Sequence, residues 1–169
     1  MRVALALVAV LSVACATAAT AGEPPPDPPG EVRVVAQTDR DSTSDCIGRP
    51  VTPLCLVEAL LACDIRDDEK LCRAVEKRYR EPRFKGVQLF PLLRLEYKIW
   101  EQIPFDPTDN LLCEGGQAGD MVVRVFKRQC PDAEYCHRWD MIPFHYVTRK
   151  KGERWELVTA CSDDRNLSR

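Results

Sequence analysis

Histidine is the side chain best suited to proton transfer near neutral pH, and the 169-residue sequence contains two. His145 alternates with Phe144 and Tyr146 in a run typical of a β-strand, so it lies on one face of the predicted sheet. If that face lines a pocket, His145 could act as a general base, with Asp140 as a second polar residue. The alternative is a histidine on a solvated face or hydrogen-bonded in the core. His137 fits an exposed turn better than an acid–base pair with Asp140.

Cysteine is the second residue type that could carry chemistry. The sequence has nine cysteines. Cys15 is either cleaved off with the N-terminal segment or acylated, so eight cysteines remain that can form disulfides. An even set behind an export signal predicts a disulfide framework, formed here by Cys46, Cys55, Cys63, Cys72, Cys113, Cys130, Cys136 and Cys161. No pair has the Cys-x-x-Cys spacing of redox sites. The alternative is a zinc site formed by Cys130, Cys136 and His137. The two-residue ligand spacing of structural zinc sites is missing here, so we expect no metal.

The pairing of these cysteines is open, because eight cysteines allow 105 connectivities. Proximity in the sequence favours Cys46 with Cys55, Cys63 with Cys72, and Cys130 with Cys136. Elimination then joins Cys113 to Cys161. A simple antiparallel meander would place these last two cysteines toward opposite ends of the sheet.

A basic cluster is the third candidate site. It is interleaved with Tyr79 and Phe84 and consists of Lys77, Arg78, Arg80, Arg83 and Lys85. The cluster could bind an anionic surface such as a lipid headgroup or an acidic polysaccharide, or it could simply be solvated charge. The formal net charge of −2 argues against nucleic acid as a partner. Hydrolase and phosphate-binding glycine motifs are missing from the sequence, and we expect no cofactor.

The N-terminal segment has the layout of a secretory signal. An apolar run follows Arg2 that is too short for a transmembrane helix, and Ala19-Thr20-Ala21 offers a cleavage site. We therefore predict a signal peptide over residues 1–21 and a periplasmic or secreted protein. Ser12-Val13-Ala14-Cys15 partly matches a bacterial lipoprotein box, so a lipid anchor at Cys15 and a membrane-anchored lipoprotein are the alternative.

The remaining chain divides into a linker and one domain. Residues 22–45 are predicted to form a Pro-rich disordered linker, within which residues 32–35 could pair as a short edge strand. In the domain over residues 46–169, Thr52 and Pro53 predict a helix start. Asp67 or Asp68 can cap a second helix, unless a single bent helix forms. Strand patterns follow at residues 93–100, 121–128, 141–148 and 155–161.

Helices followed by antiparallel strands predict an α+β domain, with one or two short N-terminal helices packed on a curved antiparallel sheet of about four strands and stapled by disulfides. This order resembles the nuclear-transport-factor-like and cystatin-like folds, and the chain looks like small exported Cys-rich proteins of Gram-negative bacteria. The resemblance covers roughly residues 46–161 and rests on element order, the Thr-Pro-Leu-Cys helix start and the Gly-Glu-Arg-Trp-Glu-Leu-Val strand. No active-site residue of these families maps onto a matched motif in this sequence.

A large number of predicted disulfides without a catalytic motif favours an exported, non-enzymatic envelope or secreted module. Its partner would be another protein or an anionic envelope component. The alternative, implied by the resemblance, is a small-pocket enzyme or small-molecule carrier of the ketosteroid-isomerase-like type that uses His145 and Asp140 between helix and sheet. A third hypothesis is an enzyme inhibitor that presents the loop over residues 103–119.

Overall fold

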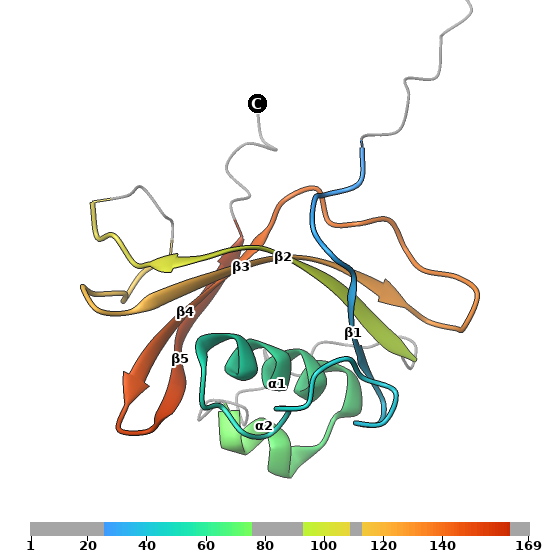
Figure 1. The fold of residues 1–169 in the computed structure, drawn as a ribbon, viewed down its shortest axis with the longest axis horizontal. Coiled ribbons are helices and arrows are strands. Elements are labelled where there is room, and N and C mark those ends of the chain that lie inside the picture. The colour runs from blue at the N-terminus through green and yellow to red at the C-terminus, as the bar shows by residue number, and fades with distance from the viewer. Residues whose placement is uncertain (1–25, 76–92, 109–112, 163–169) are drawn as a thin grey trace, which may run out of the picture.

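The computed structural model describes residues 26–75, 93–108 and 113–162 of the chain. These ranges form β1 (Arg33–Ala36), α1 (Pro53–Arg66), α2 (Glu69–Val75), β2 (Arg94–Pro104), β3 (Met121–Cys130), β4 (Phe144–Lys151) and β5 (Arg154–Ser162). The strands make one antiparallel sheet in the order β1-β2-β3-β4-β5. The sheet curves over α1, and α2 lies beyond α1 on the same concave side (Figure 1). The α+β class predicted from the sequence is confirmed.

The two helices begin and end where local sequence signals place them. The Thr52 side chain accepts a hydrogen bond of 3.0 Å from the Cys55 N–H, and Pro53 occupies the first turn of α1. Asp67 ends α1 in the left-handed conformation, with φ at 48°. Asp68 then caps α2 by accepting bonds of 2.9 and 3.0 Å from the next N–H groups. Two helices therefore form rather than one bent helix.

The sheet has five strands rather than the four that we predicted, because β1 joins it at one edge. β1 lies within residues 22–45, which we had assigned to a disordered linker. It pairs with the first half of β2, Val35 is fully buried, and Arg33 donates a 2.7 Å hydrogen bond to Glu58 of α1. β1 therefore corresponds to the short edge strand that the sequence allowed at residues 32–35 of this mostly polar segment.

Four disulfides staple the fold, with the pairing that proximity and elimination indicate. Cys46–Cys55 and Cys63–Cys72 hold the two ends of α1 to their neighbouring segments. Cys130–Cys136 closes the loop after β3. Cys113–Cys161 joins the connection between β2 and β3 to β5, with Cα atoms 5.6 Å apart.

The sheet buries apolar side chains on both faces. The concave face packs on α1 through a main core that includes Leu56, Leu61, Leu95, Tyr97, Val123, Val125 and Tyr146. On the convex face, Phe105 and Cys113 from the β2–β3 connection cover Val122 and Val147. This connection crosses the face of the sheet, so Cys113 reaches β5 although a plain meander would keep it apart from Cys161.

Several predicted features lie outside the described residues. They are the signal segment over residues 1–21, the lipid-anchor candidate Cys15, and the basic cluster of Lys77, Arg78, Arg80, Arg83 and Lys85. In the part of the chain that the structure describes, no helix is long and apolar enough to cross a membrane.

Candidate ligand-binding site

The two residues proposed for proton transfer lie on different sides of the sheet. His145 is buried on the convex face, opposite Arg124 in β3 and Cys161 in β5. Asp140 lies after the Cys130–Cys136 loop, where its N–H donates a 2.9 Å hydrogen bond to the carbonyl of Lys127. Its carboxylate interacts electrostatically with Lys127. The structure therefore does not combine His145 and Asp140 into one site.

A cavity of about 800 Å³ lies on the concave side, between the helices and β3, β4 and β5. Helix residues on its wall are Leu60, Asp64, Arg73, Ala74 and Val75. Strand residues on its wall are Lys127, Phe144, Tyr146, Lys151, Arg154, Trp155, Glu156, Leu157, Val158, Thr159 and Ala160. This volume is in the range of small-molecule sites in proteins. His145 is not among these lining residues.

The inner wall of the cavity is apolar and aromatic. Phe144 and Tyr146 are two residues apart in β4, so both side chains point to the concave face. Their ring centroids are 6.0 Å apart. Trp155 and Leu157 continue this surface on β5, and Leu60 of α1 faces it. The wall therefore suits an apolar or aromatic ligand body.

A lysine lies within this apolar surface. Lys127 of β3 shares its face of the strand with Val123 and Val125, and its Nζ is 3.7 Å from the centroid of the Phe144 ring. Burial lowers the pKa of Lys127 below its ordinary value of 10.5, while the carboxylates of Asp64 and Asp140 oppose that shift. The ammonium is thus held against an aromatic ring and two acids.

The pKa values of the two acids near Lys127 are raised, whereas that of Lys127 is lowered. Burial raises the pKa of Asp64 and of Asp140, and the Lys127 ammonium counteracts both shifts. Asp64 is solvent-exposed at the surface of α1 that lines the cavity. Burial also raises the pKa of Tyr146, so its hydroxyl stays neutral and can donate a hydrogen bond at the cavity wall.

The charged residues on the cavity wall are mostly cations. Four of them are basic, namely Arg73, Lys127, Lys151 and Arg154, whereas Asp64 and Glu156 are the acids. Coulomb interactions are stronger at a partly desolvated wall than at an open surface. Arg73 and Lys151 pair with Glu69 and Glu156, so Lys127 and Arg154 are the cations that the anionic group of an apolar ligand would meet at this aromatic wall.

Sequence reasoning missed this site, although two signals for it exist. In residues 121–128, Lys127 has the same strand parity as Val123 and Val125, which places a cation on the core-facing side. Asp64 follows Leu60 by one helical turn and so shares its face of α1. What no local pattern shows is the curvature of the sheet that brings these residues to one cavity.

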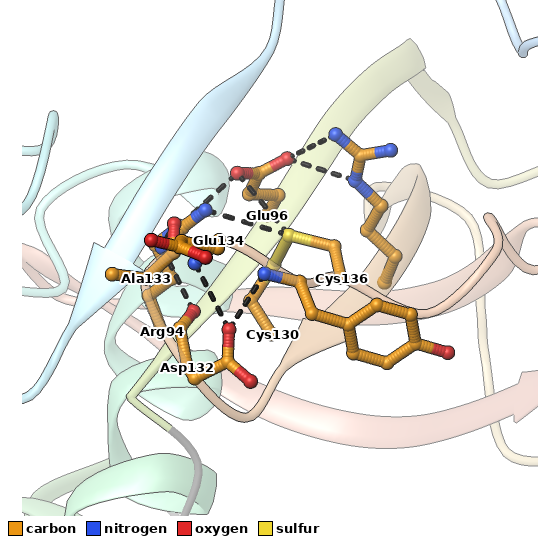
Figure 2. The surroundings of a disulfide bond; sticks show 9 residues. Arg94, Glu96, Cys130, Asp132, Ala133, Glu134 and Cys136 are labelled. Atoms are coloured by element: carbon orange, nitrogen blue, oxygen red, sulfur yellow. Dashed lines mark hydrogen bonds and ion pairs between the residues drawn. A yellow bond between two sulfur atoms is a disulfide. The ribbon is translucent and has the colours of Figure 1, made fainter.

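The loop after β3, which was the alternative zinc site, is a disulfide-closed turn. The sulfurs of Cys130 and Cys136 are joined to each other, so they do not form the thiolate pair that a zinc site with His137 would need. Figure 2 shows Arg94 and Glu96 next to this disulfide, with the Arg94 Nη2 atom 3.5 Å from the Cys136 Sγ atom. Asp132 accepts two backbone hydrogen bonds within the loop, of 2.9 and 2.6 Å.

The loop suggested for enzyme inhibition is largely packed against the sheet. In its described parts, residues 103–108 and 113–119, Phe105 and Cys113 are buried and the Cys113–Cys161 disulfide fixes it to β5. Gly116 approaches the Phe105 ring so closely that an added Cβ would lie 2.5 Å from it. This loop therefore has a structural role in covering the convex face.

Comparisons with protein-family models, with curated proteins and with solved structures found no match to this chain.

Proposed function

We propose that this protein is an exported, non-enzymatic binding module that holds an apolar molecule with an anionic group in the concave cavity. The observation that carries the proposal is the position of Lys127 among Phe144, Tyr146 and Trp155 in a cavity of about 800 Å³. An anionic envelope component with an apolar part has this chemistry. The four disulfides are compatible with export, and either a signal peptide or a lipid anchor at Cys15 would deliver the domain.

Binding is favoured over proton transfer by the position of the only histidine that had been a candidate base. His145 lies on the convex face, whereas the cavity lies on the concave one. A carrier of the ketosteroid-isomerase-like type would use the same space between helix and sheet without a base. The resemblance to the nuclear-transport-factor-like and cystatin-like folds is kept as part of this proposal, supported by the order of helices and strands.

The experiment compares decanoate with decanol, which share an apolar chain and differ in the charge of the head group. Titration calorimetry on the mature protein should show decanoate binding about ten-fold tighter than decanol. Lys127→Met should remove most of this preference, because it deletes the half-buried cation and keeps the apolar volume. Lys70→Met is the matched control, since Lys70 is exposed on α2 and outside the cavity wall. Equal binding of the two probes, or no binding of either, would overturn the proposal.

A further inference from the structure

Lys127 is a half-buried lysine whose side chain lines the cavity. Its Nζ atom lies 3.7 Å from the centroid of the Phe144 ring, and within the described ranges this nitrogen donates no hydrogen bond to the protein. Lys98, on the convex face, is buried more deeply, but its Nζ atom donates a 2.7 Å hydrogen bond to the Pro28 carbonyl. Lys127 therefore presents a nitrogen that a molecule in the cavity would contact.

The surroundings of this nitrogen favour its neutral form more than water does. Burial lowers the pKa of Lys127 below its ordinary value of 10.5, and the charges of Asp64 and Asp140 only oppose that shift. An ammonium has no free lone pair, whereas a neutral amine has one and attacks electrophilic carbon atoms. Lys127 is therefore more nucleophilic near neutral pH than a lysine in water.

The same surroundings also stabilise a positive charge at this position. The face of the Phe144 ring attracts a cation, and the carboxylates of Asp64 and Asp140 interact with the ammonium. A lysine that condenses with an aldehyde becomes a protonated imine, which carries the same single positive charge as the ammonium. The groups that hold the ammonium therefore also hold the product of the condensation.

We propose that Lys127 captures apolar aldehydes in the cavity as a reversible protonated imine. The ammonium first gives one proton to solvent, and the lone pair of Nζ attacks the carbonyl carbon to form a C–N bond. The carbonyl oxygen then takes one proton from the nitrogen and one from solvent, and it leaves as water. The net reaction converts an ammonium and an aldehyde into a protonated imine and water.

The inference rests on the proposed function in one respect, because the same cavity binds the apolar chain. Trp155 and Leu157 of β5 and Leu60 of α1 line the cavity together with Lys127, so an aldehyde bound by its chain has its carbonyl carbon within reach of Nζ. Holding the two reacting groups together in this way raises their effective concentration. Chain binding and imine formation therefore support each other.

The test adds decanal and sodium cyanoborohydride, which reduces an imine to a stable secondary amine, to the mature protein with its disulfides intact. Peptide mass mapping should find the decyl group on Lys127 about ten-fold sooner than on exposed Lys70, because the cavity holds the aldehyde beside the amine. Lys98 is the matched comparison, since it is buried but lies outside the cavity wall, and it should stay unlabelled. Excess decanoate should slow the labelling of Lys127, and acetaldehyde, which lacks the chain, should not prefer this residue.

A conservative variant separates the nucleophile from the cation. Lys127→Arg keeps a positive charge at the cavity wall, but a guanidinium stays protonated and does not form the imine. It should abolish the fast labelling with decanal and retain the preference for decanoate over decanol. Lys70→Arg is the control and should leave both unchanged, because Lys70 is exposed on α2 and outside the cavity wall.

The outcomes distinguish this inference from the proposed function. Labelling of Lys127 no sooner than Lys70, or equal labelling of Lys127 and Lys98, would overturn the capture of aldehydes by the cavity. A preference for decanoate over decanol without selective labelling by decanal would also overturn it and leave the proposed function in place. Selective labelling of Lys127 without that preference would support the capture and overturn the anionic ligand of the proposed function. Failure of both experiments would overturn both proposals.

Discussion

Glu96 is a buried carboxylate whose neighbours decide its protonation. It lies on the convex face of β2 and accepts hydrogen bonds of 2.8 and 2.6 Å from Arg128 and of 3.1 Å from Arg94. Burial alone would raise the pKa of Glu96, but the hydrogen bonds and charges of the two guanidinium groups outweigh it and hold the pKa below the ordinary 4.5. The folded protein therefore binds this proton less tightly than the unfolded chain does.

That difference predicts how stability depends on pH. A carboxyl whose pKa is lowered by folding contributes stability above its unfolded value, and the contribution is lost as the pH falls through the folded value. For Glu96 the loss begins near 4.5 and continues below it. Glu96→Gln should lower the free energy of unfolding at neutral pH, measured by urea unfolding. It should also make this free energy fall less steeply between about pH 5 and pH 3. Glu134→Gln, at an exposed position of the neighbouring loop, should leave the curve unchanged. An unchanged acid limb in Glu96→Gln would contradict the role given to the two arginines.

At the scale of elements, the disulfides differ in the burial and the charge of their surroundings. Cys136 and Cys46 are both half-buried, whereas Cys113, Cys63 and Cys72 are buried. The Cys136 sulfur lies 3.5 Å from the Arg94 guanidinium (Figure 2) and 3.7 Å from a Glu96 carboxylate oxygen, whose charge Arg94 and Arg128 balance, whereas the Cys46 sulfur lies 3.3 Å from a carboxylate oxygen of Glu58. Thiol–disulfide exchange proceeds by attack of an anionic thiolate, so a neighbouring cation favours it and a neighbouring carboxylate opposes it.

We therefore expect Cys130–Cys136 to be the first disulfide reduced under native conditions. Limited treatment with dithiothreitol, followed by alkylation and peptide mass mapping, should label Cys130 and Cys136 before Cys46 and Cys55. Arg94→Gln should slow this step, because it removes the cation next to the attacked sulfur. Arg154→Gln is the control, since Arg154 is exposed on β5 and removes the same charge from another strand of the sheet. Earlier labelling of Cys46 and Cys55 would show that exposure or strand mobility, rather than local charge, sets the order.

The elements also show which parts of the fold a sequence can reveal. The start of α1 at Thr52 and Pro53 was predictable because the signal and its structural effect lie within one turn of helix. The sequence indicated an edge strand at residues 32–35 only as one option, because the burial of β1 depends on distant groups such as Glu58, which binds Arg33. The number of strands was therefore one too low, although the strands after α2 were found.

The candidate site was less predictable than the fold. The alternation around His145 gave the correct strand but did not show which face of the sheet would be concave. Lys127 carried a usable signal, since it shares a strand face with two buried valines. Its chemistry depends on Asp64 of α1 and Phe144 of β4, which are brought together only by the packing of helix on sheet. Long-range geometry of this kind has no local sequence pattern.

At the scale of the whole molecule, one sheet is covered on its two faces by different means. α1 covers the concave face and leaves the cavity open near β5. The β2–β3 connection covers part of the convex face through Phe105 and Cys113. Asp120 and Arg149 close the base of this connection through hydrogen bonds of 2.8 and 2.7 Å. The convex cover is small, so the disulfide to Cys161 matters more for it than for the helix side.

This contrast predicts that the four disulfides contribute unequally to stability. Cys113 and Cys161 are 48 residues apart, whereas Cys46 and Cys55 are 9 apart. By loop-closure entropy the longer bridge stabilises by roughly 4 kcal/mol and the shorter by roughly 2.6 kcal/mol. Replacing Cys113 and Cys161 with alanine should therefore lower the urea unfolding free energy more than replacing Cys46 and Cys55. Hydrogen exchange should speed up at residues 113–120 and spare α1, because the main core does not depend on this bridge. Equal destabilisation by the two double variants, or faster exchange throughout α1, would show instead that the two faces of the sheet unfold as one unit.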